Sequence, residues 1–204
     1  IGGAGGAIGI QKMLNGPADG HTIVLGSPLE LIVAPLTMAA VKYKPEDMRV
    51  VGQLLKAPLV LLARKDLPAN NVDELIALAA RSGAKPLTIA TIAEGKIKAL
   101  GITAKAPLSK FPQIPAMGAH AKLPGFEFDS WAGIIVPRGT PDAVAQQLNK
   151  AVYQALQNPE IRSAFEATGN TVVNPISVAD LDALYRAEST RYQSIAKAIN
   201  FEPQ

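Results

Sequence analysis

The feature that most constrains the fold is an alternation of strand-like and helix-like segments, each closed by proline, glycine or asparagine. A short helix is predicted over 7–14, where apolar residues recur at helical spacing and Asn15-Gly16-Pro17 follows. The β-branched run from His21 to Gly26 then predicts a strand. The same alternation continues to the C-terminus. It favours an α/β fold with largely parallel sheets and helices on both faces.

Strands are expected over 49–55 and 58–63, with Pro58 between them, and Asn71 and Glu74 are placed to cap a helix that ends at Gly83. The stretch 104–125 lacks periodicity and predicts a loop. The other expected elements are strands or extended segments at 87–91, 97–103, 126–136 and 171–173, and helices that open at Thr140-Pro141-Asp142, at Asn158-Pro159 and at Ser177, the last with Leu181, Leu184, Tyr185, Tyr192 and Ile195 inward.

Composition narrows the function classes. The 204 residues are 48% hydrophobic with a net charge of +3, which is typical of a globular chain of one or two domains. The basic residues form no block that would follow phosphates, so nucleic acid is not expected as a partner. Cysteine is absent, which excludes disulfides and thiolate metal sites. The longest mostly apolar stretch, 31–41, contains Pro35 and is too short to span a bilayer.

The glycines and histidines of this sequence do not have the spacing of known phosphate-binding or catalytic motifs. After Gly3 and Gly5, the place of the third glycine of a dinucleotide-binding motif is held by Ile8. Only His21 and His120 could act as imidazole bases, and neither lies in a triad or a metal-ligand spacing. The sequence therefore predicts no catalytic residue, no metal and no cofactor.

Two loops are candidates for binding. The glycine-rich turn Gly2–Gly6 precedes the first helix and could present backbone N–H groups to a carboxylate, or could simply allow close packing. Gly26-Ser27-Pro28-Leu29-Glu30 follows the carboxyl end of a strand, where open α/β sheets bind their ligands, or it could be a plain turn.

Six stretches of the chain together resemble one family. The resemblance extends over nearly the whole chain, in the family's order, and the family is that of the Bug-type receptors of tripartite tricarboxylate transporters. The stretches are Gly3–Gly9, Ala18–Ser27, Lys42–Asp47, Leu67-Pro68 with Val72–Ile76, Gly95–Thr103, and Leu123–Gly133 with Pro137–Pro141.

The resemblance implies a periplasmic solute receptor of the two-lobe type II architecture. The first lobe would comprise 1–56 plus 131–204 and the second 57–130, closing on a small carboxylate-bearing solute like a Venus flytrap. The receptor would act as a monomer and deliver the solute to membrane permease subunits. Trp131 could report lobe closure by its fluorescence, or it could be a plain core residue. The expected solute-binding residues are Gly26, Ser27, Pro28, Leu29 and Glu30 of the first lobe, Thr91 of the second lobe, and Ser130 and Trp131 where the chain returns to the first lobe.

The chain departs from the family pattern in two ways. The family's opening strand and ligand loop should precede Ile1, and near Thr91-Ile92 the chain passes directly from one family strand to another, so we expect much of the second lobe to be absent. Glu30 stands where a hydroxyl residue is usual, and Ala34 where an asparagine is usual. Glu30 either faces solvent or selects a ligand with a positive or hydrogen-bond-donating group, because two carboxylates repel each other.

Two other functions compete with transport. A serine hydrolase would need Ser27 and His21 together, although an extended strand would hold them roughly 20 Å apart. A sensor that feeds a signalling system would use the same receptor fold.

Overall fold

The computed structural model describes residues 6–81, 97–108 and 111–201. The chain divides into two compact units, one formed by Ile1–Lys56 with Ser130–Gln204 and the other by Ala57–Asp129. None of the described helices is long and apolar enough to cross a membrane.

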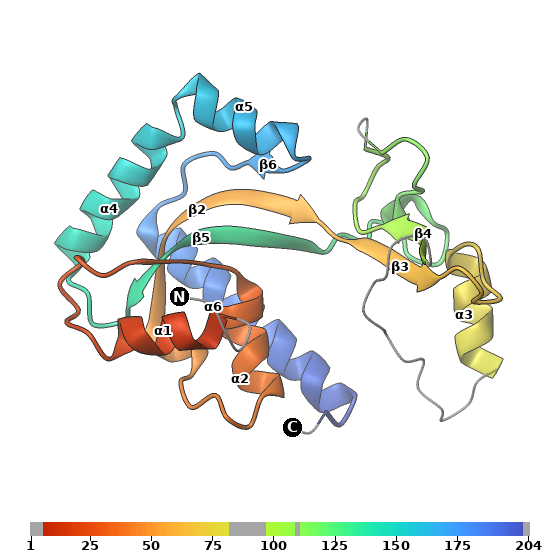
Figure 1. Ribbon diagram of the computed structural model, residues 1–204, viewed down its shortest axis with the longest axis horizontal. Coiled ribbons are helices and arrows are strands. Elements are labelled where there is room, and N and C mark those ends of the chain that lie inside the picture. The colour runs from red at the N-terminus through yellow and green to blue at the C-terminus, as the bar shows by residue number, and fades with distance from the viewer. Residues whose placement is uncertain (1–5, 82–96, 109–110, 202–204) are drawn as a thin grey trace. The chain divides into compact units, whose positions relative to one another are not determined.

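The first unit is built on a four-stranded sheet with the order β1-β5-β2-β6, and Figure 1 labels β2, β5 and β6 of this sheet. The strands are β1 (Val24–Gly26), β2 (Met48–Pro58), β5 (Asp129–Pro137) and β6 (Thr171–Val172). β5 pairs antiparallel with β1, and β6 pairs antiparallel with β2. Figure 1 also shows β5 running against β2. The α/β class is confirmed, but the expectation of largely parallel sheets is wrong for these pairs, because β5 returns between β1 and β2 in the opposite direction.

Helices cover this sheet, and most of them start where the sequence predicts. α1 (Ala7–Leu14) has the predicted bounds. α5 (Pro159–Ala167) and α6 (Val178–Ala198) are capped by Asn158 and Ser177, whose side chains accept the backbone N–H groups of Glu160 and Asp180. α4 (Asp142–Ala155) starts one residue later than expected, because Pro141 is extended and Thr140 provides no cap.

The sequence analysis missed two short helices after β1. They are η2 (Leu29–Val33), a single π-helical turn, and α2 (Ala34–Thr37). Pro28 and Pro35 interrupt the apolar pattern of this segment, yet Pro28 directly precedes η2 and Pro35 lies in the first turn of α2, and a missing N–H group is tolerated at both places. A third short helix, η3 (Pro45–Asp47), precedes β2.

Two apolar clusters pack on β2 and β5, and they place helices on both faces of the sheet. Met48 and Val50 of β2 belong to a cluster with α1, η2 and α6, whereas Val51 packs with Ala145 of α4. Two α6 residues that were expected inside, Leu184 and Ile195, are 55% and 44% exposed. The long helix buries only one narrow side, with Leu181 and Tyr185 at its centre.

An ion network around the enclosed Arg49 and Asp182 joins three elements of the first unit. Arg49 of β2 lies 2.6 Å from Asp142 of α4 and 3.2 Å from Asp182 of α6. Arg138, which follows β5, lies 3.0 Å from the same Asp182. Because Asp182 and Arg49 are nearly enclosed, each depends on the other for charge compensation.

The second unit contains the antiparallel pair β3 (Val60–Arg64) and β4 (Ile97–Ile102), together with α3 (Val72–Arg81) and η4 (Met117–Ala119). The predicted cap of α3 is confirmed: Asn71 Oδ1 accepts the N–H of Glu74, and Glu74 Oε1 accepts from Asn71 Nδ2. The predicted strand 87–91 and the expected junction at Thr91-Ile92 lie outside the described residues.

Candidate functional site

The loop after β1 is tightly fixed by its neighbours. Gly26 is buried at the end of the strand, and a Cβ there would lie 3.3 Å from Ile135 Cδ1 of β5. Pro28, which directly precedes η2, is buried. The Leu31 N–H donates a hydrogen bond to the Ser27 carbonyl. Leu29 is 56% exposed. The predicted loop residues therefore form one rigid turn at the carboxyl end of an edge strand.

Within this turn, Glu30 folds back onto Ser27. Glu30 Oε2 accepts the Ser27 N–H at 2.8 Å and the Ser27 hydroxyl at 2.6 Å. The Ser27 oxygen in turn accepts the N–H of Leu29 at 3.2 Å. Glu30 is half-buried, and its carboxylate is bonded within its own loop. The carboxylate lies within the loop that was predicted to bind a solute.

The second candidate loop meets the first. Gly6, the residue before α1, has φ 90°, and a Cβ on it would lie 2.4 Å from Glu30 Cγ. Gly6 is thus required both by its left-handed backbone and by the close approach of Glu30. The rest of that loop, Gly2–Gly5, lies outside the described residues.

Tyr43 is a site residue that the sequence analysis did not single out. Its hydroxyl donates to the main-chain oxygen of Glu30 at 2.6 Å. Burial, together with the negative charge of Glu30, raises the pKa of Tyr43 to about 12, so the phenol stays neutral and can donate. The only signal in the sequence was its place in the Lys42–Asp47 stretch that resembles the family.

The return strand β5 carries the next two predicted residues. Ser130 is half-buried, and Trp131 is only 8% exposed. The indole N–H of Trp131 donates to Glu188 Oε2 of α6 at 2.6 Å, and its ring meets Tyr185 edge to face. Trp131 is therefore part of the core of the first unit. The remaining predicted residue, Thr91, lies outside the described residues.

Both histidines have structural partners. The backbone N–H of His21 donates to Asp19 Oδ1 in a short turn. His120 Nε2 lies 2.7 Å from Asp73 Oδ2, and Lys122 Nζ lies 2.9 Å from the other Asp73 oxygen. Hydrogen bonds from Lys122 and His120 lower the pKa of Asp73. In the described part of the chain, no three histidine, cysteine or acidic residues are grouped so that they could hold a metal ion.

The first unit also has two hollows that none of the predicted site residues lines. They have volumes of about 530 and 400 Å³, and Glu46 and Arg138 belong to both. Their walls come from α1, η3 and α6 and contain acids and bases side by side. This mixture of charges indicates no single class of ligand.

Comparison with known proteins decides the family. The family model described as the tripartite tricarboxylate transporter family receptor matches residues 2–88 and 81–201. This chain belongs to that receptor family. The family is one of solute-binding receptors, as the resemblance implied.

Relatives and solved structures of the tripartite tricarboxylate receptor family agree with this assignment. A protein from Pseudomonas sp. strain P51, encoded in the tcbD-tcbE intergenic region, is 26% identical and covers 95% of this chain and 73% of its own. The periplasmic binding protein BugD is 24% identical with a TM-score of 0.77, covering 100% of this chain and 86% of its own. MatC from Rhodopseudomonas palustris with bound malate is also 24% identical, with a TM-score of 0.75 and coverages of 95% and 85%. These structures confirm the fold of a periplasmic binding protein.

The Pseudomonas relative also contains residues that this receptor lacks. It aligns over 250 positions, more than the 204 residues of the chain. The two family-model matches share residues 81–88.

Proposed function

We propose that this protein is a periplasmic receptor that captures a small carboxylate-bearing metabolite and delivers it to membrane permease subunits. The observation that carries the proposal is the match to the receptor family along residues 2–88 and 81–201. The bound malate of MatC supports a carboxylate-bearing solute. The receptor acts as a monomer, and solute binding requires no catalysis.

The receptor has two lobes, the first formed by 1–56 plus 131–204 and the second by 57–130. The division of the chain into two compact units at Lys56/Ala57 and Asp129/Ser130 supports these lobes. The sequence as given lacks a segment of the family near 91/92. The excess of aligned positions and the overlapping family matches support that gap.

The first lobe contacts the solute through the Ser27–Glu30 loop. The position of this loop at the carboxyl end of β1 supports the assignment, because open α/β sheets bind ligands there. Ser27 has a hydroxyl that reorients to donate or accept. Thr91 contributes from the second lobe, and Ser130 lies on the returning strand.

A thermal-shift screen with mono-, di- and tricarboxylates and amino acids tests this function, with isothermal titration calorimetry for each hit. We expect one class of solute to stabilise the protein and to bind one molecule per chain without chemical change. Ser27→Ala should weaken binding by about tenfold or more, because the half-buried hydroxyl that holds the Glu30 carboxylate in the loop is lost. Ser194→Ala, whose hydroxyl donates to Thr190 within α6, is the control. Absence of saturable binding, or turnover of the solute, would contradict the proposal.

A further inference from the structure

The Ser27–Glu30 loop already contains a carboxylate in its own hydrogen-bonding site. Ser27 donates both its N–H, at 2.8 Å, and its hydroxyl, at 2.6 Å, to one oxygen of Glu30. These are the donors with which such a loop would otherwise hold a carboxylate of the solute. A bare carboxylate can reach them only after Glu30 leaves.

Glu30 is held in this position from three sides. The backbone of Gly6 lies against its side-chain stem, so that no larger residue fits there. Tyr43 donates to its main-chain oxygen at 2.6 Å, and the N–H of Leu31 donates to the carbonyl of Ser27. The arrangement is a packed feature of the loop, since residues from three separate segments fix it.

The charge of Glu30 is not neutralised by a cation. Among residues 6–81, 97–108 and 111–201, no lysine, arginine or histidine lies within ion-pair distance of its carboxylate. Glu30 is half-buried, where like charges repel more strongly than in bulk water. A second carboxylate at this loop is therefore disfavoured, and a group that donates an N–H to Glu30 is favoured.

We propose that Glu30 determines solute specificity, excluding a bare carboxylate from the Ser27 loop and binding a protonated amine of the solute. This inference rests on the proposed receptor function and refines its solute class to amino acids. The carboxylate of such a solute binds to other groups of the receptor, while its ammonium group faces Glu30. The Glu30 carboxylate thus balances the positive charge of the solute's ammonium group.

Calorimetry with matched pairs of solutes tests this inference on the full chain. Each pair shares a carbon skeleton and differs only in an amine: succinate and L-aspartate, glutarate and L-glutamate, adipate and L-2-aminoadipate. We expect the wild-type protein to bind the amino member of a pair at least about tenfold more tightly. In Glu30→Gln, the amide still accepts from Ser27 but carries no charge, so the preference should narrow by about tenfold or invert.

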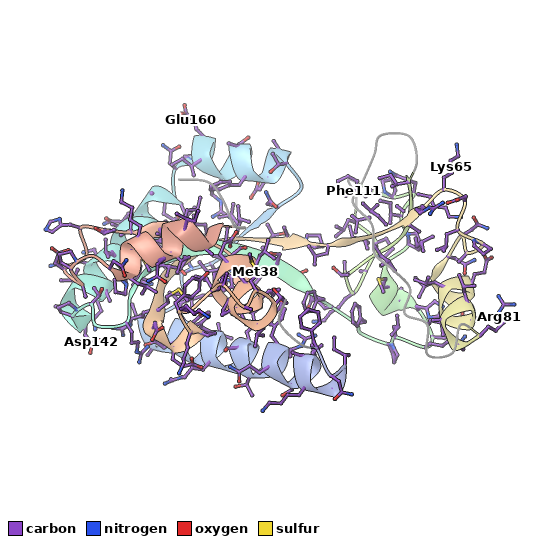
Figure 2. The ribbon with its side chains drawn as sticks, turned by 60° about the horizontal axis from the view of Figure 1, so that its bottom comes forward. Met38, Lys65, Arg81, Phe111, Asp142 and Glu160 are labelled. Atoms are coloured by element: carbon purple, nitrogen blue, oxygen red, sulfur yellow. The ribbon has the colours of Figure 1, made fainter. Side chains whose placement is uncertain are left out.

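Glu160→Gln is the matched control, because Glu160 projects into solvent from the start of α5 (Figure 2). It should keep the wild-type preference. A wild-type preference for the bare acid, or the same ratio in Glu30→Gln as in the wild type, would overturn the inference and leave the receptor function standing. Absence of binding to every member of the pairs, in each variant, would contradict the carboxylate receptor itself. The wild-type comparison needs no variant, so it decides the question even if Glu30→Gln unfolds.

Discussion

At the scale of single residues, the contact between Trp131 and Glu188 joins the returning strand β5 to helix α6. The indole donates to a carboxylate that is itself half-buried. Burial raises the pKa of Glu188, while the hydrogen bond from Trp131 and the charges of Arg191 and Lys56 lower it by less. The charged form of Glu188 therefore destabilises the folded protein.

This destabilisation predicts the direction of a pH effect on stability. A carboxyl group with a raised pKa in the folded protein stabilises it fully below the pKa of the unfolded chain, and that contribution is lost as pH rises through the folded value. Glu188→Gln removes the charge and keeps an acceptor for the indole. We expect the variant to be more stable than the wild type at pH 7, with the difference vanishing towards pH 4, where the unfolded carboxyl titrates.

Urea unfolding between pH 4 and 8, followed by the fluorescence of Trp131, measures this difference, since Trp131 is the single tryptophan of the chain. A variant that is less stable than the wild type by the same amount at every pH would contradict the prediction. Glu160→Gln again serves as the control, because Glu160 is exposed.

The position of Glu30 could be predicted from the sequence, but the contacts of its side chain could not. The sequence placed Glu30 next to a strand end and raised two possibilities, a solvent-facing side chain or a selective one. It could not show the turn of the side chain onto Ser27, because that depends on η2 and on the approach of Gly6 from another segment. Trp131 was likewise identified, but its partner Glu188 lies 57 residues away along the chain.

At the scale of elements, close packing between β2 and α4 fixes the first unit. A Cβ on Gly52 of β2 would lie 2.7 Å from Val152 Cγ1 of α4, so the glycine sets the distance between strand and helix. On the neighbouring strand, a Cβ on Gly133 would lie 2.7 Å from the carbonyl oxygen of Gly52. Asn149 adds a polar link, because its side-chain amide donates to Val51 O at 2.8 Å and Ile176 O at 3.0 Å.

We expect Gly52→Ala to lower the free energy of unfolding by about 1–3 kcal/mol, the usual cost of overpacking. Since the three nearest atoms all belong to the Val152 side chain, Val152→Ala should relieve the clash. The double variant should then lose less free energy of unfolding than the sum of the two single variants. Gly139→Ala is the control, because its Cβ would make only an ordinary contact of 3.6 Å with Ala18. Additive losses in urea unfolding would show that the two residues do not share this space.

Elements with strong local signals were predictable, and the others were not. α1, α5 and α6 follow from apolar spacing and from caps that act within one turn. η2 and α2 were missed, since two prolines interrupt their pattern although both are tolerated where these helices begin. The direction of β5 depends on where the chain returns to the sheet, which no local pattern contains.

Across the whole molecule, we expect the receptor to hold one solute per chain. The alignment with the Pseudomonas relative spans 250 positions, more than the 204 residues of this sequence, and the family match continues to residue 201. The Ser27–Glu30 loop belongs entirely to the first unit, where α1, η2 and β5 fix its shape.

Native mass spectrometry in the presence of a mixture of carboxylates and amino acids tests this claim most directly, because one spectrum reports chain mass and bound solute. We predict a folded protein with a single solute adduct that is released on collisional activation and weakened in Ser27→Ala. A folded chain that carries no adduct at any solute concentration would contradict the claim that this protein is a solute receptor.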